Sequence, residues 1–209
     1  MKFRSTVLAS TLALMGTASI GAQAAFENLA VDNSTFATAQ AVGAVGSGGA
    51  INVFGVRGSV SLFGFLVEDD NKPDFYSFTI GGNQTLTLTV DTPDGPQFND
   101  DPMVGLFSAD GTRLAVDDDG GPGYDSKLTY LINNPGTYYA AVAGFDDFNF
   151  DGIADLFADE GSGSSIPNSN FQYTLQIAAV NGPAPVPVPA AGWLLGSALL
   201  AFARRRKAA

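Results

Sequence analysis

The chain has no cysteine and no histidine among its 209 residues. Without cysteine it forms no disulfide bonds, so the fold must be held by packing or by bound ions. Without histidine it has no Cys/His zinc site and no His-dependent serine or cysteine hydrolase machinery. The P-loop, the G-x-G-x-x-G motif and the G-x-S-x-G elbow are also missing. With 18 aspartates, some carboxylate pair at glycosidase spacing is expected by chance, and we predict that the protein is not an enzyme.

Basic residues are scarce between the two ends of the chain. Residues 25–181 hold only four of them together with all 21 acidic residues, which gives this region a formal charge of −17. Such a surface repels nucleic acid, so we expect no nucleic-acid partner. It suits hard cations, because carboxylate oxygens are the ligands that Ca²⁺ prefers. Acidity alone is weak evidence, since an acidic face is usually a solvated one.

The first 24 residues have the pattern of a secretory signal peptide. Lys2 and Arg4 precede an apolar run over residues 7–20, and Ala22 and Ala24 then form an A-x-A cleavage site. We predict cleavage after Ala24. An uncleaved membrane anchor is the alternative, and the shortness of the apolar run argues against it.

The C-terminal end combines a proline-rich spacer, residues 182–189, with an apolar segment and a basic tail, residues 190–209. Fourteen helical residues rise about 21 Å, and counting back to Val186 brings the run near the lower limit for a hydrocarbon core of roughly 30 Å. The basic run at 204–207 would stay on the cytoplasmic side. We therefore predict a transmembrane helix, with a buried helix as the alternative.

Within this end, a proline motif, a Trp-Leu-Leu-Gly-Ser run and a basic cluster follow one another over residues 186–209. The motif residues are Val186, Pro187, Pro189, Ala190, Ala191, Arg204, Arg205 and Arg206. The segment resembles the PEP-CTERM type of sorting signal in its VPxPA variant. The resemblance implies that an exosortase, a membrane transpeptidase, is the processing partner. It also implies transient anchoring in the inner membrane, then secretion to the cell surface or extracellular matrix of a Gram-negative bacterium. Val188 replaces the commoner glutamate, which leaves the exact processing enzyme open.

Residues 25–181 are enough for one domain and contain short alternating runs divided by Gly, Pro, Asn and Asp. TLTLTV, residues 85–90, places its two leucines and its valine on one face, as in a half-buried strand. Similar runs predict strands at 59–67, 74–80, 127–132, 137–144 and 171–180, and a hairpin at 103–117 around Asp110-Gly111. Seven to nine short strands indicate an all-β, antiparallel β-sandwich.

The order in which these predicted strands follow one another along the chain is also informative. KPDFYSFTIGGNQTLTLTV, DPMVGLFSADGTRLAVDDDGG, DSKLTYLINNPGTYYAAVAGF and FQYTLQI follow one another over residues 55–180. Together they resemble the bacterial pre-peptidase C-terminal domain. The resemblance implies a jelly-roll-like sandwich that serves exported proteins as a non-catalytic accessory module. Some members of that family bind calcium or matrix polymers.

One segment, DDFNFDGIADLFADE at residues 146–160, combines six acidic with five large apolar residues. Its start fits D-x-N-x-D-G-x-x-D, the first nine positions of the EF-hand calcium loop. The ligands predicted from this fit, counting the backbone carbonyl of position 7, are Asp147, Asn149, Asp151, Ile153 and Asp155. Gly152 would permit the sharp turn. Position 12 is Ala158 and no helices flank the loop, so it looks more like the isolated loops of dockerin or thrombospondin type 3 repeats.

The apolar residues of this segment favour a calcium-folded loop over a merely acidic, turn-rich one. We expect that a bound Ca²⁺ lets them dock on the sandwich; they are Phe148, Phe150, Ile153, Leu156 and Phe157.

A second acidic cluster follows the predicted strand that contains Arg113. Three consecutive aspartates cannot all face one pocket, so we expect one or two ligands here, Asp117 and Asp119. In the resembled family this loop can carry metal ligands. We expect Asp69, Asp70, Asp74, Asp100 and Asp101 to be solvated turn acids, although one of them could complete a site across loops.

Two functions remain open. The first is a calcium-stabilised structural or adhesive protein of the extracellular matrix. The second is a carbohydrate-binding module with exopolysaccharide as its partner, since sandwiches of this kind host both roles. Sugar binding uses exposed aromatic platforms, and the loop residues that could form one are Phe98, Tyr124, Phe145 and Phe148. Several coplanar rings on one open face would favour the second function.

Overall fold

The computed structural model describes residues 21–62, 65–68, 72–93, 100–153, 155 and 170–183. Twelve strands and no helix occur in this part of the chain. Accordingly, none of it forms a helix that is long and apolar enough to cross a membrane. The predicted signal segment up to residue 20, the sorting motif and the C-terminal transmembrane segment lie outside the described residues.

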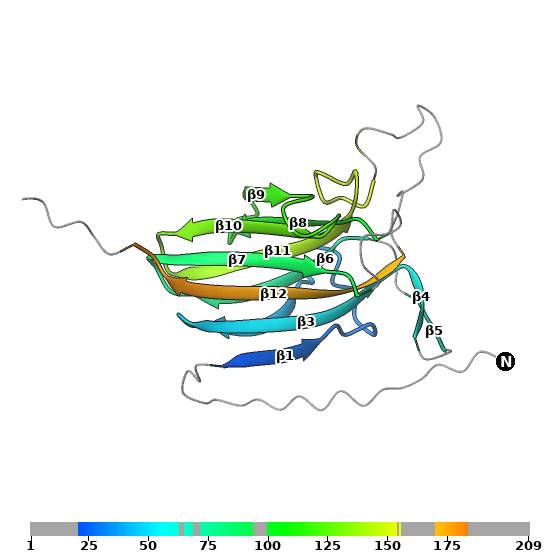
Figure 1. The fold of residues 1–209 in the computed structure, drawn as a ribbon, viewed down its shortest axis with the longest axis horizontal. Coiled ribbons are helices and arrows are strands. Elements are labelled where there is room, and N and C mark those ends of the chain that lie inside the picture. Colours follow the sequence, from blue (N-terminus) through cyan, green and yellow to red (C-terminus); the bar gives the residue numbers. More distant parts are fainter. Residues whose placement is uncertain are drawn as a thin grey trace, which may run out of the picture.

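The first of two large sheets has the strand order β1-β3-β12-β7-β10. Figure 1 looks onto this sheet and shows the five strands side by side. Their bounds are β1 Ala22–Phe26, β3 Gly49–Arg57, β12 Phe171–Asn181, β7 Gln84–Asp91 and β10 Ser126–Ile132. On β7, Leu86, Leu88 and Val90 are fully buried, while the threonines between them are half-exposed. The period of two therefore turns one face of the sheet inward and leaves the other to solvent.

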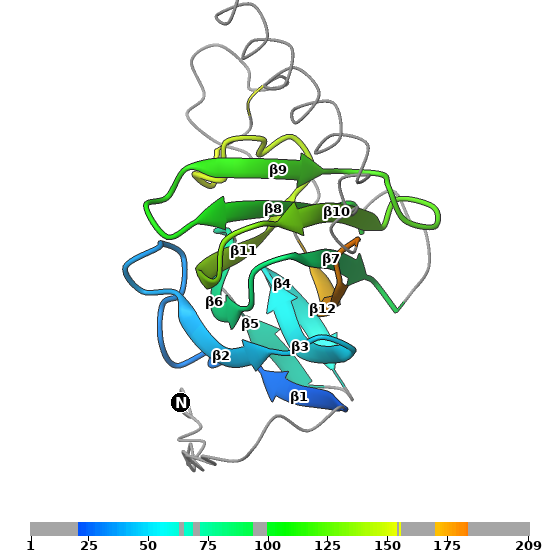
Figure 2. The same ribbon diagram turned by 90° about the vertical axis from the view of Figure 1, so that its left-hand side faces the viewer.

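The second large sheet has the order β2-β6-β11-β8-β9 and lies behind the first in Figure 1. Its strands are β2 Gln40–Val45, β6 Asp74–Ile80, β11 Gly136–Gly144, β8 Pro102–Ser108 and β9 Arg113–Asp117. A separate pair, β4 Ser59–Leu62 and β5 Phe65–Glu68, projects from one end of the sandwich. Figure 2, turned by 90°, places β9 and β1 at opposite ends of the molecule.

The main core fills the space between the two large sheets. Inward-facing residues such as Tyr76, Leu106 and Ile177 belong to it and are almost completely buried. A second apolar cluster covers the outer face of the second sheet. There Phe75, Phe107 and Ala141, which alternate with the residues of the main core, pack against Phe150 from a loop. The second sheet is therefore buried on both faces at this place, and loops rather than strands supply its outer cover.

The predicted all-β sandwich is confirmed, and so are the strands at β6, β7, β10, β11 and β12 and the hairpin of β8 and β9. The run at 59–67 is not one strand, because Leu62 pairs with Phe65 and the chain folds back as β4 and β5. The expectation of purely antiparallel sheets is wrong at two edges. There β1 pairs with β3, and β2 pairs with β6, in parallel.

Strands β1, β2 and β3 were not expected from the sequence pattern. β1 and β2 consist largely of Ala, Gly and Gln, which have little intrinsic preference for strands. They are edge strands, and each takes its conformation from the neighbour that it pairs with. β3 has a stronger alternation, with Ile51 and Val53 inside, but Gly49 and Gly55 interrupt the run.

Candidate metal centre

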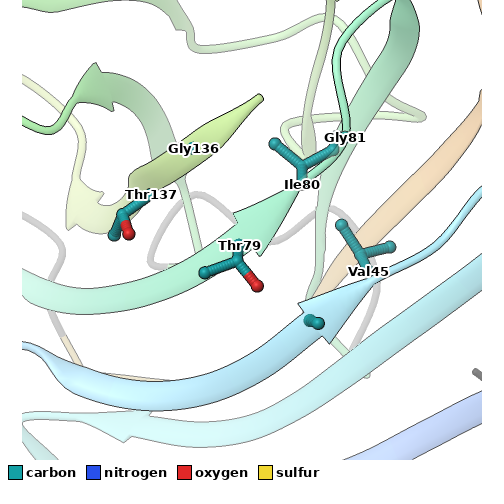
Figure 3. A pocket seen from close by; sticks show the side chains of 7 residues that line it. Val45, Thr79, Ile80, Gly81, Gly136 and Thr137 are labelled. Carbon is teal, nitrogen blue, oxygen red and sulfur yellow. The ribbon is translucent and has the colours of Figure 1, made fainter. Parts of the chain in front are cut away.

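A shallow pocket at the ends of β2, β6 and β11 has a volume of about 240 Å³. Its lining consists of Ala44, Val45, Thr79, Ile80, Gly81, Gly136 and Thr137 (Figure 3). None of these side chains titrates near neutral pH or binds metals well. The pocket therefore offers no chemistry of its own, and the acidic loops at the other end of the sheet are the better candidates.

Strand pairing brings the two predicted acidic segments to one end of the second sheet. β8 starts where β9 ends, because the two strands are antiparallel and Val104 lies opposite Asp117. β11 ends at the same place, since Gly144 lies opposite Pro102. The N–H of Phe145 then donates to the carbonyl of Asp101 at 2.8 Å. The loop after β11 is thus tied directly to the residue that precedes β8.

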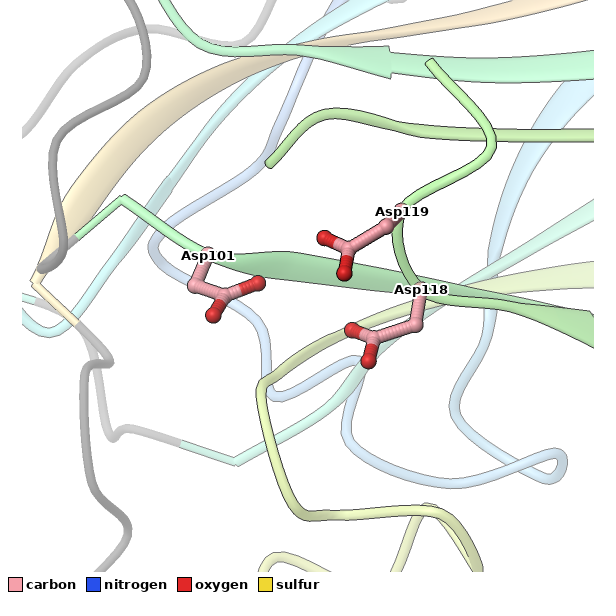
Figure 4. Close-up of side chains that lie close together, drawn as sticks. All are labelled: Asp101, Asp118 and Asp119. Atoms are coloured by element: carbon pink, nitrogen blue, oxygen red, sulfur yellow. The ribbon is translucent and has the colours of Figure 1, made fainter. Parts of the chain in front are cut away.

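Three acids converge at this end, namely Asp101, Asp118 and Asp119 (Figure 4). Each offers one carboxylate oxygen, and these oxygens lie within 4.8 Å of one another. No other three acidic side chains in the described ranges meet this closely. Asp119 was predicted as a ligand. Asp101 was named only as one of several acids that could complete a site across loops, and Asp118 was passed over within its run.

Burial and mutual repulsion make this cluster costly to ionise without a cation. Burial raises the pKa of Asp101 to about 7, and the charges of Asp118 and Asp119 add to the effect. Burial likewise raises the pKa of Asp118 to about 6, with the charges of Asp119 and Asp117 contributing. The Oδ1 atoms of Asp101 and Asp118 are both buried, and neither has a hydrogen-bond partner within the described part of the chain.

The carboxylate of Asp117 does not join this group. Its Oδ1 accepts the N–H of Gly120 at 2.8 Å and the N–H of Lys127 at 2.7 Å. A side chain at position 120 would collide with this carboxylate, since a Cβ there would lie 2.4 Å from Asp117 Oδ2. Asp117 therefore stabilises the turn that contains Asp118 and Asp119 and helps to orient their carboxylates toward Asp101.

The other predicted site, the loop at 146–155, is closed by hydrogen bonds among its own residues. The two carboxylate oxygens of Asp147 accept the N–H groups of Asp151 at 2.9 Å and Gly152 at 3.0 Å. Asp155 accepts the backbone N–H and the side-chain amide of Asn149 at 3.0 and 2.8 Å. Gly152 has φ +85°, in the left-handed region that the predicted turn requires. The loop has the predicted turn, but much of its ligand capacity already serves the backbone.

Asp147 is fully buried, and burial raises its pKa to about 6. The N–H groups of Asp151 and Gly152 act in the opposite direction, as does the positive charge of Arg57. Arg57 is itself fully buried and donates from Nη1 to the carbonyl of Val142 at 3.2 Å. The positive charge of Arg57 thus supplies part of the neutralisation of Asp147 that we expected from a metal ion.

The apolar residues of this loop dock only in part. Phe150 is buried and meets Phe107 edge-to-face, with ring centroids 5.5 Å apart. Phe148 packs against the same cluster, and its carbonyl accepts a hydrogen bond from Arg113. Ile153 is 57% exposed and does not dock in this structure, so its docking in the presence of Ca²⁺ stays a prediction. Leu156 and Phe157 lie outside the described residues.

The donor chemistry of the Asp101–Asp118–Asp119 cluster fits a hard divalent cation. Three carboxylates supply up to six oxygens, and Ca²⁺ takes six to eight oxygen ligands in flexible geometry. A cation there would coordinate the two buried Oδ1 atoms and offset both the burial and the mutual repulsion that raise the pKa values of Asp101 and Asp118. Sequence reasoning predicted one of the three residues of this site, Asp119, as a ligand. The missing signal was the pairing of β8 with β9, which brings together residues that are 17 positions apart.

Residues 73–144 match the sequence model of the bacterial pre-peptidase C-terminal domain. This is a narrower span than the expected 55–180 and less than half of the chain. The structure is similar to the pre-peptidase C-terminal domain of a collagenase from Bacillus anthracis. There the identity is 15%, 68% of this chain and 95% of that chain are covered, and the TM-score is 0.35.

A second similar structure is PliG from Aeromonas hydrophila, a periplasmic inhibitor of g-type lysozyme. Here the identity is 13%, 76% of this chain and 97% of that chain are covered, and the TM-score is 0.33. No curated protein matches the chain.

Proposed function

We propose that this chain is an exported, non-catalytic protein whose sandwich is stabilised by Ca²⁺ and which has a structural or adhesive role at the cell surface or in the extracellular matrix. The observation that carries the calcium proposal is the convergence of Asp101, Asp118 and Asp119, two of which bury a carboxylate oxygen that has no hydrogen-bond partner among the residues the structure describes. The match of residues 73–144 to a domain that is not catalytic supports the absence of an enzymatic role.

Calcium bound at this cluster would link the start of β8 to the end of β9. Asp101 precedes β8, whereas Asp118 and Asp119 follow β9, so one ion would hold the two ends of the hairpin together. The loop after β11 would be held as well, through the hydrogen bond from Phe145 to Asp101. The ligand set predicted from the sequence, Asp147 to Asp155, would form a second and weaker site, because its carboxylates must first give up backbone hydrogen bonds.

Thermal melting of the exported protein, with Ca²⁺ and with a chelator, tests this proposal. One site at a calcium concentration a hundredfold above its dissociation constant adds about 2.7 kcal/mol to the free energy of unfolding. We expect a clear rise in melting temperature for the unaltered chain and a much smaller one, from the weaker site alone, for the double variant Asp101→Asn, Asp118→Asn. Asp151→Ala should keep most of the rise, because Asp151 belongs to the weaker site.

The variant pair separates the two sites. If Asp151→Ala abolishes the calcium response and the double asparagine variant keeps it, calcium binds in the loop at 146–155 instead. Equal melting of the unaltered chain with calcium and with chelator refutes calcium stabilisation altogether.

Export and sorting complete the proposal. The A-x-A site at Ala22 and Ala24 and the motif from Val186 to Arg206 support processing by a signal peptidase and by an exosortase-type transpeptidase, with the inner membrane as a temporary anchor. Mass spectrometry of the released protein should find an N-terminus at Ala25 and a C-terminus near Pro189. A released chain that still ends in the basic cluster would contradict exosortase processing.

The alternative function is a carbohydrate-binding module. The loop aromatics proposed for it do not form a platform, since the rings of Phe145 and Phe148 are 73° apart and both residues are half-buried. Tyr124 is also half-buried, and Phe98 lies outside the described residues. Support for a glycan partner comes instead from the opposite sheet.

A further inference from the structure

The outer face of the first sheet differs from the rest of this acidic molecule. The positions that alternate with the core along its strands carry both polar and apolar side chains. The hydroxyl and amide groups among them are Asn52 on β3, Thr85, Thr87 and Thr89 on β7, Thr129 on β10, and Gln172, Thr174 and Gln176 on β12. Two exposed apolar residues, Leu131 on β10 and Val180 on β12, share this face with them. The charged residues at the outward positions of these five strands, within the described ranges, are Asp91 and Lys127. This face is therefore nearly neutral, although the chain has 21 acidic residues.

Strand register aligns these polar groups in rows across the sheet. Asn52 lies opposite Gln176, and Gln176 lies opposite Thr89. The Gln176 amide donates to Asn52 Oδ1 at 3.1 Å, so the row is ordered by its own hydrogen bond. Neighbouring strands lie roughly 4.8 Å apart, and such a row therefore presents regularly spaced donors and acceptors perpendicular to the strands.

The next row along the strands begins with two exposed aromatic rings. Phe26 on β1 is 73% exposed and Phe54 on β3 is 42% exposed. Their rings stack with centroids 5.3 Å apart and an interplanar angle of 30°. Thr174 on β12 continues this row, and Asp91 on β7 ends it. Large exposed apolar groups are informative when they gather at one place, because such a patch favours contact with a ligand or partner over contact with water.

These rings line a groove of about 420 Å³ that crosses one end of the sheet. The rest of its lining comprises one acidic residue, Glu27, together with Leu29, Gly55, Val56, Val67, Pro93, Gln172, Tyr173 and Thr174. The volume falls within the roughly 300–1,000 Å³ of ligand sites. This end of the face is therefore hollowed.

The ring pair is held in place by the residue that follows it. The N–H of Glu27 donates to the carbonyl of Phe54 at 2.9 Å, and the Glu27 carboxylate accepts the N–H of Val56 at 2.8 Å. The segment of Phe26 is thereby pinned to β3, so that its ring is presented without being covered. A rigid, exposed ring loses little conformational freedom when a ligand stacks on it.

We propose that this groove and the adjoining polar rows bind a neutral polysaccharide chain lying across the strands. The apolar face of a sugar ring stacks on an aromatic ring, and its hydroxyls require the mixed donors and acceptors that threonine, asparagine and glutamine supply. The charge of −17 over residues 25–181 repels acidic polymers and anionic lipid, which leaves an uncharged chain as the matching occupant. The inference goes beyond calcium stabilisation and does not depend on it.

Binding of the exported protein to immobilised neutral polysaccharides tests the proposal. The probes are β-1,3-glucan, β-1,4-glucan, α-1,4-glucan, xylan, mannan and galactan, with alginate as the acidic polymer. We expect retention on at least one neutral polymer and none on alginate. Phe54→Ala should weaken retention at least tenfold, whereas Phe54→Tyr keeps the ring and should retain binding. Val116→Ala, at an exposed apolar position on β9, is the matched control and should bind like the unaltered chain.

Melting curves of each variant confirm that a loss of binding is not a loss of fold. Failure to bind any of the six neutral polymers overturns the proposal. It is also overturned if sedimentation shows a concentration-dependent dimer that Phe54→Ala abolishes, because the groove would then bind a second copy of the chain. Addition of chelator leaves glycan binding intact if the fold survives, so the calcium and glycan proposals fail separately.

Discussion

At the scale of single residues, the fully buried Asp147 shows how this protein compensates a carboxylate in its interior. Two backbone N–H groups and the nearby charge of Arg57 oppose the effect of burial on its pKa. A buried charge without such partners is strongly destabilising. The same residue therefore has a structural role whether or not the loop binds a metal.

Replacement of Asp147 by alanine should destabilise the protein in chelator as well as in calcium. The N–H of Gly152 loses its acceptor, and leaving such a donor without a partner costs about 1–3 kcal/mol. The N–H of Asp151 loses one of two acceptors, since it also donates to Asn149 Oδ1 at 3.0 Å. Chemical denaturation in the presence of chelator measures the loss. Asp110→Ala is the control, since Asp110 accepts similar hydrogen bonds in an exposed turn and its loss should cost less. An equal effect of the two substitutions would contradict the structural role of Asp147.

At the scale of elements, the loop after β11 is attached to the second sheet by aromatic packing over a glycine. A Cβ at Gly105 would lie 2.7 Å from ring atoms of both Phe107 and Phe150. Phe150 itself has φ +59°, an unfavourable backbone conformation for a large residue, and the burial of its ring offsets that strain. The close approach of the loop to β8 thus requires glycine, with no side chain, at position 105.

Gly105→Ala should therefore push Phe150 off the sheet. Forcing an extra methyl group into a packed core costs about 1–3 kcal/mol. We expect a lower melting temperature together with faster hydrogen exchange in the loop at 146–153. Gly136→Ala is the matched control on neighbouring β11, since a Cβ there would contact nothing within 4 Å. Unchanged exchange in the loop of the Gly105 variant would show that the packing of Phe150 does not hold it.

Elements of this fold were predictable where the alternation of side chains was complete. β7 and β12 have apolar residues at every second position and were found within a residue or two. β1 and β2 were not, because an edge strand of alanine and glycine owes its conformation to its neighbour. The same limit applies to the acid cluster. Asp119 could be predicted as a ligand from the local sequence. The role of Asp101 could not, because it depends on the register between β8 and β9, which no local pattern encodes.

At the scale of the whole molecule, the excess of acids makes stability depend on pH and on cations. The pKa values of Asp101, Asp118 and Asp147 are raised in the folded state, so the folded protein holds protons that the unfolded chain releases. Stability therefore falls as pH rises between the unfolded value near 4 and the folded values of about 6 to 7. A bound cation would remove this dependence at the cluster by replacing the protons.

In chelator, the melting temperature should be higher at pH 5 than at pH 7.5. Calcium should raise it at pH 7.5 and have little effect at pH 5, where protons compete for the carboxylates. Scanning calorimetry over this range provides the measurement. The double variant Asp101→Asn, Asp118→Asn should flatten the dependence in chelator, since its amides do not titrate. A melting temperature that climbs with pH in chelator would contradict the assigned protonation.

Strand β1 spans residues 22–26, and the predicted signal-peptide cut falls inside it. Removal of Ala22, Gln23 and Ala24 would strip the backbone of Ala50, Ile51 and Asn52 of its neighbours in the ladder. Export would then do more than detach a leader. It would expose the edge of β3 in the first sheet, and the unpaired backbone groups of such an edge can pair with a strand of another chain.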